Sequence, residues 1–111
     1  GSWLGWGEDV MLAGRRIEKY CKERNINCDS VNLYYNYLGT WVGSKFSHIY
    51  NLSGNLRYTE SDYYILNRLA ISQNFSKFPY SVKPFFNVEF RGFVQAWVFR
   101  GDDLKKSGFK F

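Results

Sequence analysis

The sequence predicts an α+β domain in which about four helices come first and a β-hairpin follows. Apolar residues recur at helical spacing through much of the first two thirds of the chain, and after Pro79 the chain becomes dense in Phe, Val and Trp. A chain of 111 residues fits one compact domain. We therefore expect a single domain over residues 1–111, with a helical part at about 8–72 and a β-rich part at about 80–111.

The first predicted helix runs from Glu8 to Arg24. Acidic residues stand in its first turn, where the helix dipole favours anions, and Asn25 supplies a stop. Its apolar stripe consists of Val10, Ala13, Ile17, Tyr20 and Cys21. Its other face gathers basic residues, namely Arg15, Arg16, Lys19, Lys22 and Arg24.

Three shorter helices are expected to follow. Asp29 or Ser30 can cap a second helix over Val31 to Thr40, although the alternation of apolar residues fits a strand nearly as well, so residues 30–42 stay open between the two. A third helix is predicted from Ser44 to Leu52, between Gly43 and the run Ser53-Gly54-Asn55. A fourth runs from Thr59 to about Ser72 and begins with an approximate capping box.

The β-rich part predicts a hairpin of strands Phe85 to Phe90 and Phe93 to Phe99, with Arg91-Gly92 as the turn or bulge between them. The segment from Arg100 to Asp103 has turn chemistry. The tail from Lys105 to Phe111 is therefore expected to add a third strand or a basic arm.

The segment from Leu38 to Leu52 meets the demands of a helix-turn-helix, in which two short helices cross steeply around a left-handed residue. With Gly43 as the turn glycine, Gly39 is the small contact residue, and Ile49 falls on the inward side of the second helix. The outward positions all offer hydrogen bonds to bases or phosphates, and they are Ser44, Lys45, Ser47, His48 and Asn51.

On these residues the run from Leu38 to Tyr50 resembles the helix-turn-helix of phage-repressor-type transcription regulators, and the resemblance extends over residues 14–72. It implies that the helix from Ser44 to Leu52 lies in the major groove of DNA. The β-rich segment from Tyr80 onward fits a winged-helix relative, in which a hairpin follows the helices. The expected fold is thus a helix-turn-helix core followed by a C-terminal hairpin, winged-helix-like.

The charge pattern points to a polyanionic partner. The formal net charge is +5, and no Asp or Glu occurs between Ser30 and Thr59 or between Tyr63 and Val88. We expect a DNA-binding protein that serves as a regulator or as an accessory factor in plasmid or phage DNA processing. Its partner is expected to be double-stranded DNA, with single-stranded DNA as the alternative. A homodimer or a larger protein-DNA complex is left open. The contact residues expected beside the helix-turn-helix are Arg57, Arg15, Arg16 and Lys19.

Catalysis is not expected, because the chain offers one histidine, two cysteines and mostly isolated carboxylates, and no phosphate loop, zinc signature or nucleophile elbow. No cofactor and no metal are expected. Cys21 and Cys28 could form a disulfide or contribute to a metal site, and reduced, partly buried thiols are favoured. A long apolar run and an export signal are both missing, so we expect a cytoplasmic protein without a membrane span.

Two other functions remain open. Four tryptophans and ten phenylalanines could leave an exposed aromatic patch, the mark of a protein-protein interaction module. A single-strand nucleic-acid binder is the other alternative, with aromatic side chains between basic residues as a stacking platform. The candidate platform consists of Tyr34, Tyr35, Tyr37, Trp41 and Phe46.

Overall fold

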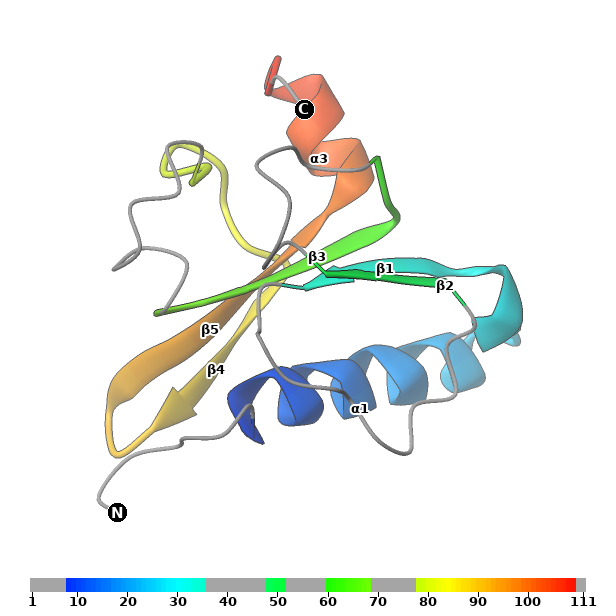
Figure 1. The fold of residues 1–111 in the computed structure, drawn as a ribbon, viewed down its shortest axis with the longest axis horizontal. Coiled ribbons are helices and arrows are strands. Elements are labelled where there is room, and N and C mark those ends of the chain that lie inside the picture. Colours follow the sequence, from blue (N-terminus) through cyan, green and yellow to red (C-terminus); the bar gives the residue numbers. More distant parts are fainter. Residues whose placement is uncertain (1–7, 36–47, 52–59, 69–77, 110–111) are drawn as a thin grey trace.

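The computed structural model describes residues 8–35, 48–51, 60–68 and 78–109, and in these ranges the chain forms one mixed sheet with helices packed on it (Figure 1). The helical elements are α1 (Glu8–Glu23), the short 3-10 helix η1 (Cys28–Ser30) and α3 (Gly101–Lys106). The strands are β1 (Asn32–Tyr35), β2 (His48–Asn51), β3 (Tyr63–Asn67), β4 (Phe86–Phe90) and β5 (Phe93–Arg100).

The sheet has five strands in the order β2-β1-β3-β5-β4. Strand β1 pairs in parallel with both β2 and β3, so that Leu33 has Ile49 as a partner on one side and Tyr63 on the other. The remaining pairs, β3 with β5 and β5 with β4, are antiparallel. The sheet is therefore parallel on the β2 side and antiparallel on the β4 side.

Both faces of the sheet are covered, and β3 shows how the sequence achieves this. Successive side chains of a strand point to opposite faces. Tyr63 and Ile65 pack in the cluster that contains the apolar stripe of α1, whereas Tyr64 and Leu66 pack in a second cluster with Leu104 of α3. Every residue of β3 is buried. The sequence of a strand that is buried on both faces is a nearly continuous apolar run, because neither face needs polar residues.

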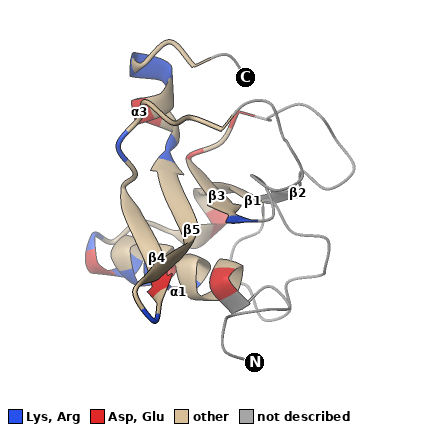
Figure 2. Cartoon of the chain, turned by 90° about the vertical axis from the view of Figure 1, so that its left-hand side faces the viewer, with Lys and Arg blue, Asp and Glu red and all other residues tan. Residues whose placement is uncertain are grey.

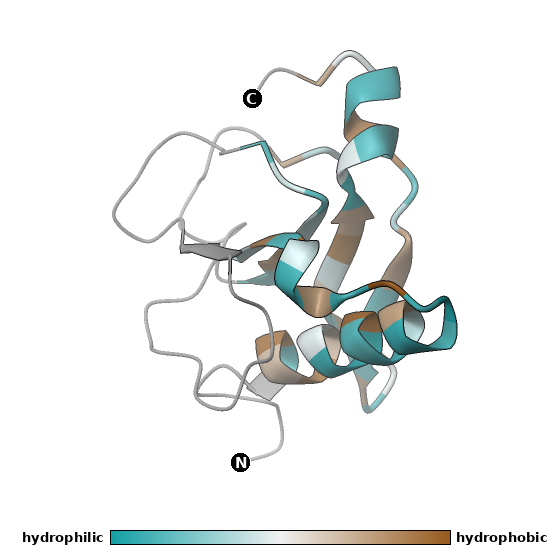
Figure 3. Cartoon of the chain, turned by 90° about the vertical axis from the view of Figure 1, so that its right-hand side faces the viewer, coloured by the Kyte–Doolittle hydropathy of each residue, from teal (hydrophilic) through white to brown (hydrophobic). Residues whose placement is uncertain are grey.

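Helix α1 confirms the first predicted helix. Val10, Ala13, Ile17 and Cys21 are buried and lie against the sheet. The helix ends next to Asn25, whose positive φ of 57° marks the expected stop. Figure 3 shows hydrophilic residues on the last turns of α1 and on most of α3, with hydrophobic residues gathered in the strands between them.

The predicted hairpin is also confirmed, as β4 and β5. Its turn is Arg91-Gly92, with φ values of 53° and 81°. A two-residue turn with both central residues at positive φ matches the right-handed twist of the flanking strands. The register shifts between Val88 and Glu89, which is the irregularity expected of a β-bulge.

The predicted four-helix core with its helix-turn-helix is wrong, although the broad α+β class holds. Residues 48–51, expected in the third helix, form β2, and residues 63–67, expected in the fourth, form β3. Residues 32–35 adopt the strand alternative of the second helix. Pairing with strands that are distant in the sequence overrides the local helical spacing in all three segments. The observed order, in which one long helix precedes a mixed sheet, does not match the predicted winged-helix-like arrangement of a helical core followed by a hairpin.

The segment after β5 also differs from the prediction. Residues 101–106 form helix α3, which replaces the turn predicted at Arg100 to Asp103 and takes in the first two residues of the tail predicted from Lys105 to Phe111 as a third strand or a basic arm. The proposed turn glycine Gly43 lies outside the described residues. Within the described ranges, no helix combines the length and the apolar character needed to cross a membrane.

Candidate functional site

The structure brings together only part of the predicted contact set. Arg15, Arg16 and Lys19 are exposed on α1. His48 and Asn51 are the first and last residues of β2, a strand rather than the expected recognition helix, and only their backbone is described. The remaining predicted contacts lie outside the described residues, and they are Ser44, Lys45, Ser47 and Arg57.

A groove runs between α1 and β4, with a volume of about 360 Å³. We call it the helix–hairpin groove. It is lined by Leu12, Arg15, Arg16 and Lys19 from the helix and by Val88 and Glu89 from the strand. Figure 2 shows Lys and Arg residues on α1 and at the turn of the neighbouring hairpin. The groove therefore combines an apolar floor with three cations and one carboxylate.

Arg16 is held in place by two contacts with β4. Its Nη1 donates a hydrogen bond to the backbone oxygen of Asn87 at 3.1 Å, and its guanidinium lies 4.2 Å from the centre of the Phe86 ring. A guanidinium stacked on an aromatic face keeps its remaining N–H groups in a fixed plane, ready for a bidentate acceptor such as a phosphate. Among the described residues, none of the three groove cations is ion-paired with a carboxylate.

The turn of the β4–β5 hairpin adjoins this groove and presents aromatic residues. We call Phe90, Arg91, Gly92 and Phe93 the hairpin tip. Phe93 is 65% exposed, and the guanidinium of Arg91 lies 5.4 Å from the centre of the Phe90 ring. In Figure 1 this turn projects past the N-terminal end of α1.

Sequence reasoning missed Leu12 and Phe93, because single exposed apolar residues carry no periodic signal. Leu12 was simply another residue of the helix, and Phe93 was one apolar residue in a strand rich in them. The Arg91-Gly92 pair was the available signal, because a tight turn at that point leaves the next residue at the end of the hairpin.

A second cleft, of about 430 Å³, lies where β1 and β3 begin and β5 ends. Two of its five charged side chains are paired with each other. Lys105 forms an ion pair with Glu60, and this hydrogen bond raises the pKa of Lys105. Asp62 accepts a hydrogen bond from the backbone N–H of Asn32 at 2.7 Å. With Asp102 the cleft is lined by three carboxylates and two cations, so a polyanion would meet a net negative charge there.

A third depression, of about 610 Å³, is lined by residues from 81–85, β5 and α3. Its arginine is already paired with a carboxylate. Arg100 donates two hydrogen bonds of 3.0 and 3.2 Å to Asp103, and these bonds raise the pKa of Arg100. Lys83 and Lys106 are its other cations. This depression is a weaker candidate for anion binding than the helix–hairpin groove.

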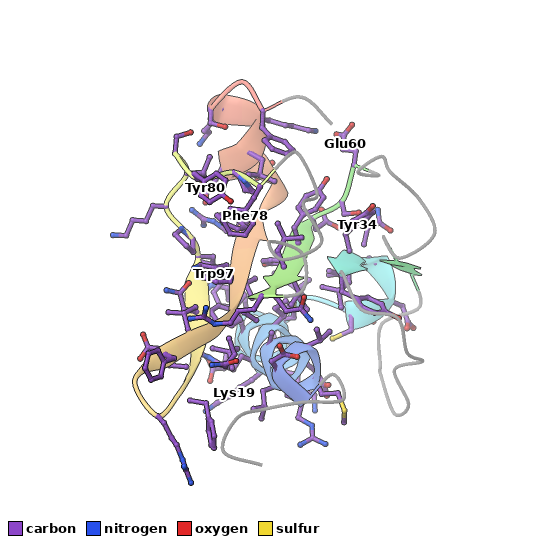
Figure 4. All side chains as sticks on the ribbon, turned by 60° about the vertical axis from the view of Figure 1, so that its left-hand side comes forward. Lys19, Tyr34, Glu60, Phe78, Tyr80 and Trp97 are labelled. Carbon is purple, nitrogen blue, oxygen red and sulfur yellow. The ribbon has the colours of Figure 1, made fainter. Side chains whose placement is uncertain are left out.

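Among the described residues, the exposed aromatic side chains Tyr80 and Phe93 lie on separate parts of the surface. Tyr80 is 76% exposed and packs on Phe78 at 4.8 Å between ring centres, and Phe78 in turn packs edge-on against Trp97. Figure 4 shows this aromatic group well apart from Lys19 on α1. Among the residues described, no group of three or more His, Cys, Asp or Glu side chains converges as a metal site would require.

Chemically, the helix–hairpin groove suits a ligand that carries several negative charges and some apolar surface. Three cations that pair with no carboxylate among the described residues can bind phosphates, and the hairpin tip offers a ring for stacking. Comparison of the chain with protein-family models, with curated proteins and with solved structures finds no match. The site is therefore interpreted from its own geometry and charge.

Proposed function

We propose that this protein is a non-enzymatic nucleic-acid-binding module whose contact surface is the helix–hairpin groove together with the hairpin tip. The carrying observation is the set of Arg15, Arg16 and Lys19 on one side of α1, next to an exposed turn that adds Arg91. The net charge of +5 supports the same conclusion, because a basic protein is drawn to a polyanion over a longer range. A helix-turn-helix plays no part in this proposal.

The groove cations are suited to contacts with the phosphate backbone. Arg16 is preorganised by Phe86 and by the backbone oxygen of Asn87, so little side-chain entropy is lost when it binds a phosphate. Arg15 and Lys19 are exposed and can reach phosphates on either side of it. Phosphate contacts position a protein on nucleic acid without reading its sequence, so the groove supplies affinity rather than specificity.

The direct test is the salt dependence of binding, measured by fluorescence anisotropy with labelled oligonucleotides. Three or four phosphate contacts should weaken the affinity by roughly one to two decades between about 50 and 200 mM salt. The double variant Arg15→Ala with Lys19→Ala should lower the slope of log K against log salt by about 1.5 to 2. Its fold should be unchanged, because both side chains are exposed.

The matched control is the double variant Lys83→Ala with Lys106→Ala, which removes the same charge from the third depression. This control should leave the salt slope close to that of the wild type. A larger loss in the control than in the α1 variant would move the interface to the depression beside α3. Folded protein that binds no oligonucleotide at the lowest salt would refute nucleic-acid binding altogether.

A protein partner is the second candidate, and it is favoured by the exposure of Leu12 at 40% and of Phe93 at 65%. Exposed apolar surface of this kind is a feature of interaction sites when it is contiguous. Salt distinguishes the two candidates, because apolar association responds little to ionic strength whereas phosphate contacts respond steeply.

A further inference from the structure

The backbone of the hairpin tip holds an aromatic residue in a fixed position. The two-residue turn holds Arg91 and Gly92 at φ values of 53° and 81°, and Phe90 and Phe93 are partners across the last rung of the ladder. This turn type continues the twist of the strands and joins them without further loop residues. The position of Phe93 is therefore set by the sheet and not by a long loop.

The tip lies on the same side of the sheet as α1. Phe86 and Val88 of β4 pack in or against the cluster that contains the apolar stripe of α1. Side chains two residues apart along a strand share a face. The extra residue at the register shift lies in β5, because Val88 pairs with Ala96 and Glu89 with Val94, so β4 keeps its alternation and Phe90 follows Phe86 and Val88. Phe93 shares that face as the cross-strand partner of Phe90. The aromatic tip is thus continuous with the basic helix–hairpin groove.

The two rings of the tip differ in what covers them. The guanidinium of Arg91 lies over Phe90, whereas no ring or cation among the described residues packs on Phe93, which is 65% exposed. An exposed aromatic ring beside cations is the arrangement that single-strand binders use, because an unpaired base stacks on the ring while its phosphates meet the cations. Bases inside a duplex are already stacked on their neighbours and offer no free face.

We infer that the ligand is a nucleic acid with unpaired bases, and that Phe93 stacks one of these bases while Arg91 and the groove cations bind the flanking phosphates. This inference rests on the proposed function, since it names the class of nucleic acid that the groove takes. The charge of the adjoining groove is complementary to the sugar-phosphate backbone, which selects this occupant over an apolar protein segment.

The test compares two substitutions at Phe93 by anisotropy, with a short single-stranded oligonucleotide and its duplex. Phe93→Leu keeps an apolar side chain but removes the ring, and Phe93→Trp enlarges it. We expect Phe93→Leu to weaken single-strand binding by about ten-fold, Phe93→Trp to retain it, and duplex binding to change less than two-fold. The matched control is Tyr80→Leu, at an exposed ring away from the groove, which should change neither affinity.

A fluorescent base analogue, 2-aminopurine, placed within the single strand gives a direct readout of stacking. Its emission should change on binding to the wild type and should stay unchanged with Phe93→Leu at saturating protein. Thermal melts should show both Phe93 variants folded, because the side chain is exposed.

The remaining outcomes separate the inference from the proposed function. Salt-dependent binding that Phe93→Leu leaves intact, or weakens equally for both strand types, overturns the stacking inference and leaves nucleic-acid binding standing. The stacking inference is also overturned if Phe93→Leu binds single strands tightly and Phe93→Trp does not bind them. That result would imply a pocket for a smaller side chain. Folded wild-type protein that binds neither oligonucleotide overturns both.

Discussion

Replacing Gly101 with alanine should destabilise the protein, although Gly to Ala is ordinarily a stabilising change in a helix. Gly101 is the first residue of α3, and its N–H donates to the backbone oxygen of Asp62 at 2.8 Å. A Cβ at this position would meet the backbone carbonyl of Ser61, at 3.2 Å from its carbon and well inside van der Waals contact with its oxygen. The clash is with backbone, which cannot rotate away as a side chain would.

The carbonyl of Ser61 is fixed from both sides. The N–H of Ser61 donates to the Tyr64 hydroxyl at 2.7 Å, and the N–H of the next residue, Asp62, donates to the oxygen of Asn32 at 2.9 Å. Overpacking of this kind costs about 1–3 kcal/mol, and the gain in helix propensity offsets at most about 1 kcal/mol of it. The free energy of unfolding should therefore fall by about 1–2 kcal/mol, and the Tm by roughly 5–15 °C for a domain of about this size.

Thermal unfolding followed by circular dichroism measures this effect. The control is Lys106→Ala, an exposed position in the same helix, for which the free energy of unfolding should change by less than about 0.5 kcal/mol. An alanine variant at position 101 as stable as the wild type, or more stable, would show that α3 does not begin in contact with the segment before β3. The reasoning on the packing of α3 would then be wrong.

Three further predictions address the hairpin, the core and the cysteines. Arg91→Asn should raise the free energy of unfolding by about 0.5–1 kcal/mol, because asparagine tolerates the positive φ of this turn better than arginine. The same variant should weaken oligonucleotide binding, because it removes a cation. Stability measured by thermal melts and affinity measured by anisotropy should therefore change in opposite directions, and a change of both in the same direction would contradict the prediction. Burial raises the pKa of Tyr63 from 10.0 to about 12, so the stability that its neutral phenol contributes is complete below about pH 10 and is lost as the pH rises toward 12. Tyr63→Phe should therefore have a shallower loss of Tm over that range, and an equally steep loss would speak against the burial of this phenol. Burial also raises the pKa of the Cys21 thiol, so iodoacetamide should modify the half-buried Cys28 first in the folded protein. Peptide mass spectrometry measures the two rates of modification, and equal rates would contradict the prediction.

The elements that could be predicted from the sequence are those whose pattern is local. Helix α1 has one buried stripe and an exposed remainder, so the spacing of Val10, Ala13 and Ile17 identifies it without any knowledge of its neighbours. The hairpin of β4 and β5 pairs segments that are adjacent in the chain, with a turn of Arg91 and Gly92 between them. In both cases the signal and the structure that it specifies lie within the same short stretch.

The inner strands gave a misleading signal because their environment is not local. Strand β3 is buried on both faces, so its apolar run has no period of two, and with the residues that follow it fits a helical spacing. Strand β1 is decided by partners at positions 48–51 and 63–65, which the sequence does not mark as partners. The expected helix-turn-helix fell in this region, and the predicted recognition helix overlaps β2.

The candidate site divides in the same way. The sequence by itself determined that Arg15, Arg16 and Lys19 lie on the exposed side of a helix, because helical spacing separates them from the apolar stripe. Only the tertiary structure decided what lies beside them, since the residue that holds Arg16 is 71 positions away, in β4. A helix fixes the relative positions of its own side chains, whereas a groove between two elements depends on how a distant strand packs, and that packing is set by the burial of the whole sheet.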